Sequence, residues 1–106
     1  NTFTRSQHDK GSYSMEFLVR FEVEPPPSMT TDERERLRGL EKIRAMELRE
    51  QGILLRLWRV PGRRAVVGLW EASDATALHD ALVSLPMFPW MDVTVEALAT
   101  HPQEKK

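Results

Sequence analysis

Apolar and charged residues alternate near the start of the chain, in the segment that spans residues 15–23. Phe17, Val19, Phe21 and Val23 occupy every second position. They alternate with Glu16, Leu18, Arg20 and Glu22, of which only Leu18 is uncharged. This period of two predicts a β-strand with one face packed on a core. Comparable patterns predict three further strands, at residues 53–60, 64–71 and 92–98.

A helical period replaces the alternation in residues 30–51. The apolar residues that a rotation of about 100° per residue brings onto one side are Leu37, Leu40, Ala45 and Leu48. Thr30 followed by Glu33 is typical of a capping box at the start of a helix. Gly52 is suited to the left-handed conformation that ends one. These signals predict one long amphipathic helix.

A hairpin and a second helix follow in the sequence. The dipeptide Pro61-Gly62 separates two of the predicted strands and is a turn signal, so these strands are expected to pair. The second helix is predicted over residues 75–85, with Ser73 or Asp74 as its cap.

The order βαββαβ is typical of the ferredoxin-like fold, an α+β architecture. It predicts a four-stranded antiparallel sheet with two helices on one face. The other face would carry a mixture of apolar and charged side chains, at positions that include Leu18, Arg20 and Glu96. Such a face suits either water or the sheet of a second subunit, in the manner of a dimeric α/β barrel.

The folded domain is predicted to span residues 15–102 of the 106. Residues 1–14 are polar and unpatterned, and we interpret them as an artificial remnant or a flexible native extension. Residues 103–106 are polar and are expected to fray.

The composition argues against several classes of function. The formal net charge is −1 and basic residues are interspersed with acidic ones, which argues against a nucleic-acid partner. There is no cysteine and the three histidines lie far apart, so no metal site is predicted. No apolar run approaches the length of a membrane span. We expect a cytoplasmic protein with no membrane partner.

Glu41 is the most informative single residue, because it projects near the middle of the apolar side of the first helix. A carboxylate aimed at a core must be paired, hydrogen-bonded or used in chemistry. One interpretation is a structural ion pair with Arg44, three residues later. The other is a catalytic base, for which Asp92 and Glu96 are the alternatives if Glu41 is exposed.

From Met15 to Pro102 the chain resembles muconolactone isomerase and its relative chloromuconolactone dehalogenase. The segments that carry the resemblance are FLVRF at 17–21, Glu41-Lys42, Leu57-Trp58-Arg59, Leu78-His79-Asp80, LPMFPWMDVTVEAL at 85–98 and His101-Pro102.

The resemblance implies a cofactor-free isomerase of aromatic catabolism, in the 3-oxoadipate route. Its substrate would be a small unsaturated lactone with a carboxylate side chain, on which a proton moves from one carbon to another. The base in the family is a glutamate at the position of Glu41. The resemblance also implies homodimers with paired sheets, which assemble into larger rings, commonly decamers.

Three positions depart from the family pattern. Arg64 and Val66 stand where the family usually has tyrosine and asparagine, and Leu54 replaces a tryptophan. Arg64 or Arg44 could hold a carboxylate or an enolate oxygen, whereas Val66 can donate no hydrogen bond. Further residues expected at the substrate site are Trp58 and Phe88, since aromatic walls surround small ligands.

These departures keep two other functions open. The chain could be a non-catalytic or repurposed relative that binds a small apolar acid or serves as an oligomeric module. A cofactor-free monooxygenase or dehalogenase on the same fold is a third possibility, because a fold does not determine its chemistry.

Overall fold

The computed structural model describes residues 14–104. Its strands and helices in chain order are β1 (Met15–Val23), α2 (Thr31–Glu50), β2 (Leu54–Arg59), β3 (Ala65–Ala72), α3 (Ala75–Val83) and β4 (Met91–Leu98). Two short 3₁₀ turns, Phe88–Trp90 and Pro102–Glu104, precede and follow β4. The first 13 residues of the predicted extension lie outside the described range.

The strands form one antiparallel sheet in the order β2-β3-β1-β4. In the central pair, Phe17 lies opposite Trp70 and Val19 lies opposite Gly68. The predicted ferredoxin-like α+β fold is therefore confirmed.

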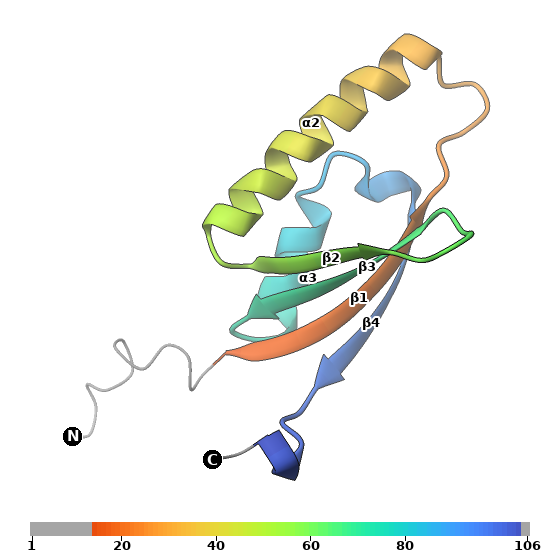
Figure 1. The fold of residues 1–106 in the computed structure, drawn as a ribbon. Coiled ribbons are helices and arrows are strands. Elements are labelled where there is room, and N and C mark those ends of the chain that lie inside the picture. The colour runs from red at the N-terminus through yellow and green to blue at the C-terminus, as the bar shows by residue number, and fades with distance from the viewer. Residues whose placement is uncertain (1–13, 105–106) are drawn as a thin grey trace.

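Both helices cover the same face of the sheet (Figure 1). Leu48 from α2 and Leu78 and Leu82 from α3 join the strand residues Phe17 and Trp70 in one buried cluster. Burying a side chain of this kind stabilises the fold by roughly 1.5–3 kcal/mol relative to leaving it exposed. The alternation in β1 and the helical period of α2 thus meet in this cluster, while Leu37 of α2 packs in a second buried cluster with Met29 and Met87.

The ends of α2 follow the predicted signals. The Thr30 hydroxyl accepts a hydrogen bond of 3.1 Å from the Glu33 N–H, which caps the first turn. At the other end Gly52 has φ +78°, and the Ile53 N–H donates to the Leu48 carbonyl. Glycine adopts this left-handed conformation without the steric penalty of a Cβ atom.

The prediction that Leu40 lies on the buried side of α2 was wrong. Leu37 and Leu48 are buried, but the Leu40 side chain is 42% exposed. On a helical wheel Leu40 lies well to one side of the line through Leu37, Glu41 and Leu48, and that line is what faces the sheet. With Leu40 outside the buried side, Glu41 lies closer to the centre of that side, between Leu37 and Leu48.

A β-bulge in β2 changes which residues face the helices. Pairing with β3 shifts register between Leu54 and Arg56, so that Leu54 faces Trp70 and Leu57 faces Gly68. Because the bulge adds one residue, Leu54 and Leu57 share the helix side although they are three apart. Trp58 turns to the opposite face.

The hairpin after β2 closes as its dipeptide predicted. Gly62 has φ +73°, and the Arg63 N–H donates to the Val60 carbonyl across the turn. Proline followed by glycine with positive φ is typical of a type II turn.

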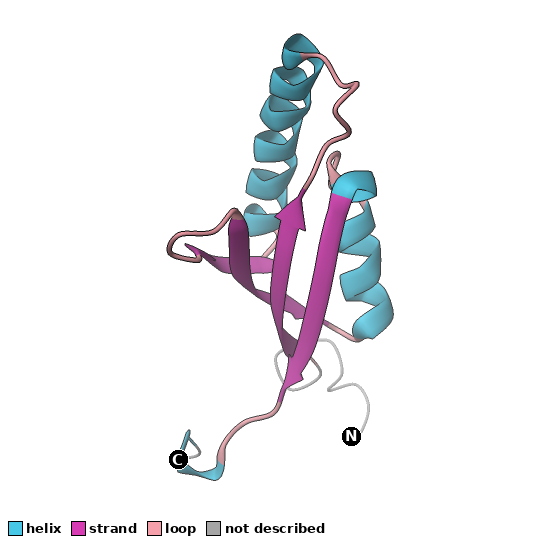
Figure 2. Ribbon diagram, turned by 90° about the vertical axis from the view of Figure 1, so that its right-hand side faces the viewer, coloured by secondary structure: helices cyan, strands magenta, loops and turns pink. Residues whose placement is uncertain are grey.

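No helix of the described residues covers the second face of the sheet (Figure 2). Its paired positions include Leu18 with Leu69 and Arg20 with Val67. Trp58 is 44% exposed there, and the Arg56 guanidinium stacks over its ring at 5.1 Å. The predicted mixture of apolar and charged groups is confirmed.

Candidate active site

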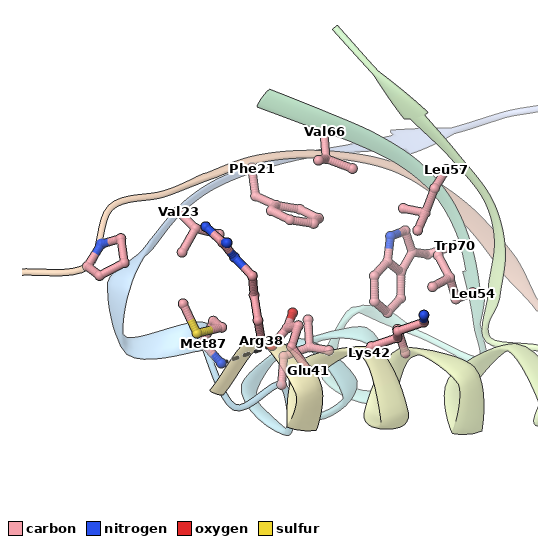
Figure 3. A pocket seen from close by; sticks show the side chains of 13 residues that line it. Phe21, Val23, Arg38, Glu41, Lys42, Leu54, Leu57, Val66, Trp70 and Met87 are labelled. Atoms are coloured by element: carbon pink, nitrogen blue, oxygen red, sulfur yellow. Dashed lines mark hydrogen bonds between the residues drawn. The ribbon is translucent and has the colours of Figure 1, made fainter. Parts of the chain in front are cut away.

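A cavity of about 360 Å³ lies between α2 and the helix side of the sheet (Figure 3). Apolar side chains form most of its wall, among them Phe21, Leu54, Leu57, Val66, Trp70 and Met87. The charged residues on its lining are Arg38, Glu41 and Lys42, all from α2. This size and composition are typical of a site for a small organic ligand.

Glu41 points from α2 into the space between Phe21 and Trp70 (Figure 3). One carboxylate oxygen, Oε1, accepts a hydrogen bond of 2.9 Å from the Met87 N–H. Met87 lies in the turn between α3 and β4, so a residue distant in sequence orients the carboxylate. No other bond to Glu41 occurs within the described residues, which leaves Oε2 without a protein donor there.

Burial raises the pKa of Glu41 above its ordinary value of about 4.5, while the hydrogen bond from Met87 offsets part of that rise. The side chain is half-buried, and apolar surroundings disfavour its charged form. A carboxylate with a raised pKa is a stronger base than an exposed one. Such perturbed groups in cavities are candidates for acid–base chemistry.

The structural alternative for Glu41, an ion pair with Arg44, does not occur. The Arg44 guanidinium instead contacts Glu47 at 2.9 Å and donates to the Ser84 hydroxyl at 2.9 Å. Arg44 belongs to a surface contact between α2 and the end of α3 and does not line the cavity.

The structure brings some of the predicted site residues together. Leu54 and Val66 line the cavity beside Glu41. Trp58 lies on the opposite face of the sheet because of the bulge, and Phe88 packs edge-on against His79 with ring centroids 6.5 Å apart. Neither Trp58 nor Phe88 lines the cavity.

Arg64 lines a second hollow that continues from the first. This outer hollow, called the mouth below, shares Phe21, Val23, Pro25, Arg38 and Val66 with the cavity. Arg34, Arg59 and Arg64 are added to Arg38 on its lining, with Glu24 as the one acidic residue. Arg64 thus lines the mouth rather than the cavity that holds Glu41.

Two cations beside Glu41 were missed. Lys42 is exposed on α2, and it also lines the cavity. Arg38 precedes Glu41 by one helical turn and reaches toward Val23 (Figure 3). The sequence signal for Arg38 was its spacing of three residues from Glu41, because residues i and i+3 lie on the same face of a helix.

The alternative bases do not face the cavity. Asp92 and Glu96 are exposed on β4, and the register places them with Glu22 and Leu18 on the uncovered side of the sheet. Within residues 14–104, no group of three or more histidine, aspartate or glutamate side chains could hold a metal ion. In the same range, no helix is long and apolar enough to cross a bilayer.

The fold and the cavity together define a ferredoxin-like α+β domain with a half-buried carboxylate in an apolar pocket. A family model of muconolactone delta-isomerases matches residues 15–104, nearly all of the described range. The chain belongs to the muconolactone delta-isomerase family.

Individual relatives agree with the family match. The chain is 39% identical to the muconolactone delta-isomerase of Pseudomonas aeruginosa over 88 residues, 83% of this chain and 92% of the relative. It is 38% identical to muconolactone delta-isomerase 2 of Acinetobacter lwoffii over 87 residues, 82% of this chain and 91% of the relative. A crystal structure of a muconolactone isomerase superimposes with a TM-score of 0.79 and 36% identity, covering 85% of this chain and 94% of that one.

Proposed function

We propose that the chain is an isomerase that moves a proton on a small unsaturated lactone bearing a carboxylate, with Glu41 as the general base. The observation that carries the proposal is the Glu41 carboxylate, which is half-buried in an apolar cavity and anchored at one oxygen. Membership of the muconolactone delta-isomerase family supports the lactone as the substrate class.

The proposed reaction consists of two proton transfers. The free oxygen of Glu41 takes a proton from a carbon next to the lactone, and the electron pair of that C–H bond enters a dienolate. The protonated carboxyl group then returns the proton to another carbon of the dienolate, which moves the double bond. One carboxylate serves both steps, so the proposed chemistry needs no cofactor.

Positive charge beside Glu41 would stabilise the dienolate intermediate. A dienolate carries negative charge on the lactone oxygen, and a cation or donor fixed near that oxygen lowers the barrier. Arg38 and Lys42 line the same cavity as Glu41 and can supply this charge. We propose Arg38 or Lys42 for the oxyanion and the substrate carboxylate, in place of Arg44.

The apolar wall shapes which lactone is accepted. Val66 lies on the cavity lining where an amide is usual in the family, and Leu54 lies there in place of a tryptophan. A missing hydrogen-bond donor changes substrate preference more than a change in apolar volume does. The preferred lactone is therefore expected to differ from muconolactone in its polar substituents, while muconolactone itself is still turned over.

The first test is to incubate the purified chain with muconolactone and follow double-bond migration by proton NMR. We expect catalytic turnover, with kcat/KM below the range of about 10⁴–10⁸ M⁻¹s⁻¹ that is usual for preferred substrates. Binding of the lactone without any turnover would favour the alternative of a relative that only binds small acids. If muconolactone is neither bound nor turned over, the lactone is rejected as the substrate class.

A further inference from the structure

The mouth of the cavity carries an excess of positive charge that one carboxylate cannot neutralise. Four arginines, Arg34, Arg38, Arg59 and Arg64, line it together with one glutamate, Glu24. A carboxylate has two oxygens, and one bidentate pair with a guanidinium group engages both of them. A single acidic group therefore leaves part of this lining unmatched.

These arginines have no acidic partners among the described residues. The ion pairs found within residues 14–104 join Arg20 to Glu22 and Arg44 to Glu47, on other parts of the surface. The Nε atom of Arg34 is buried and has no hydrogen-bond acceptor within that range. A buried donor without an acceptor is unfavourable, and an anion bound in the mouth would remove this penalty.

The two sides of the mouth come from different elements. Arg34 and Arg38 lie one turn apart on α2, where like charges at this spacing repel each other. Arg59 ends β2 and Arg64 immediately precedes β3, so these two belong to the hairpin. Arg59 reaches the helix side because of the bulge after Leu54. An anion between α2 and the hairpin would be held from both sides.

We propose that the mouth is a subsite for a second acidic group, so that the preferred substrate is a dianion. Its apolar lactone body would occupy the cavity beside Glu41, and one carboxylate would meet Arg38 at the boundary that the two hollows share. The additional acidic group would lie in the mouth among Arg34, Arg59 and Arg64. This inference rests on the proposed function for the identity of the lactone body.

Direct binding measurements test the subsite without requiring turnover. Calorimetry at constant ionic strength would compare butyrate, glutarate and tricarballylate, which carry one, two and three carboxylates on short chains. We expect the two polyacids to bind at least about tenfold more tightly than butyrate. The double variant Arg34→Gln/Arg64→Gln is expected to reduce this preference to about twofold or less, because the charges that distinguish the acids are removed.

Arg63→Gln is the matched control, since Arg63 neighbours Arg64 in the hairpin turn but does not line the mouth. It is expected to keep the preference for polyacids. Equal affinity for all three acids would overturn the proposal, as would a preference that survives in the double variant or disappears in the control. If the acids do not bind and the double variant changes the sedimentation coefficient, the arginines serve contacts between copies of the chain and the proposal is wrong.

The two proposals fail in different ways. Equal affinities for the three acids, together with turnover of muconolactone, would contradict the proposal of a dianionic substrate and would agree with the isomerase proposal. Selective binding of the polyacids without turnover of any lactone would support the anion subsite and would contradict the isomerase proposal.

Discussion

A carboxylate on the inner side of a helix is unfavourable for folding unless something compensates it. Glu41 lies between Leu37 and Leu48 on the line of α2 that faces the sheet, and the hydrogen bond from Met87 satisfies one of its oxygens. The other oxygen faces a cavity that is largely apolar. Placing a charge where it is poorly solvated is a stability cost that natural sites accept for reactivity.

This cost predicts a pH-dependent gain in stability for Glu41→Gln. The pKa of Glu41 is raised in the folded state, so its contribution to the free energy of unfolding is most favourable at pH values below the ordinary glutamate pKa. That contribution is lost as the pH rises through the pKa of Glu41 in the folded state. Glutamine does not ionise and avoids the loss, and its amide oxygen can still accept from Met87. Thermal unfolding should therefore show a higher Tm for the variant at pH 7.5 and a much smaller difference at pH 4.

Glu35→Gln, on the exposed side of the same helix, controls for the general loss of a negative charge. It should not reproduce the gain at pH 7.5. A Glu41→Gln variant that is less stable than the wild type at both pH values would contradict the proposed desolvation of this carboxylate.

The hairpin of β2 and β3 forms much of the sheet-side wall of the cavity, beside Phe21 and Val23 of β1, and Gly68 sets the shape of the hairpin part. A Cβ atom at Gly68 would lie 2.6 Å from the Trp70 Nε1 atom and 3.0 Å from Leu57 Cδ2, far inside van der Waals contact. Trp70 is 1% exposed and has little freedom to move away. The glycine thus allows the indole and Leu57 to meet on the cavity wall.

Gly68→Ala is predicted to lower the free energy of unfolding by about 1–3 kcal/mol, the usual effect of overpacking a core. It should also reduce kcat/KM for any accepted lactone, because Trp70 and Leu57 would be displaced into the cavity. Chemical denaturation and steady-state kinetics would measure the two effects.

Gly39→Ala, in the middle of α2, is the matched control, since apart from the adjacent residues and the nearby backbone of the helix no atom lies within 4 Å of its added Cβ. Removing a glycine from a helix interior should raise stability by roughly 0.5–1 kcal/mol. If Gly68→Ala behaved like this control, the close packing of Trp70 on Gly68 would be refuted.

Local patterns predicted the elements better than they predicted the site. Alternation identified β1 and the helical period identified α2, because both depend on burial of one face of a single segment. The bulge at Leu54 depends on pairing with β3, so the sequence of β2 alone could not show that Trp58 turns away and Arg59 turns inward. The hydrogen bond from Met87 to Glu41 joins residues 46 positions apart, which no local pattern reveals.

Over the whole molecule, the two faces of the sheet differ in cover. One face is packed under both helices, while the other exposes Trp58 and Leu98 and leaves Leu18 and Leu69 partly accessible. An uncovered face with apolar residues among charges fits an interface, because exposed apolar patches on proteins are often contact surfaces. We propose that two copies of the chain pair through this face, and that such dimers can assemble further, up to the decamer that the family resemblance implies.

Leu69→Glu should weaken this pairing, because it places charge at the centre of the uncovered face without touching the buried cluster under the helices. Analytical ultracentrifugation is expected to show a smaller species than the wild type, with an unchanged far-UV circular dichroism spectrum. Gln51→Lys, at the exposed end of α2, should sediment like the wild type. Identical sedimentation of Leu69→Glu and wild type would argue against pairing through the sheet.

In the proposed mechanism Glu41 is the general base. The most direct test compares the wild type with Glu41→Gln and measures how kcat/KM for muconolactone depends on pH. The wild type should gain activity as pH rises through a pKa above the ordinary glutamate value, because the base acts as the carboxylate. Glu41→Gln should lose about 10²–10⁴-fold in kcat/KM and should lack that rising limb. A variant that keeps wild-type activity and the same pH profile would show that another group moves the proton.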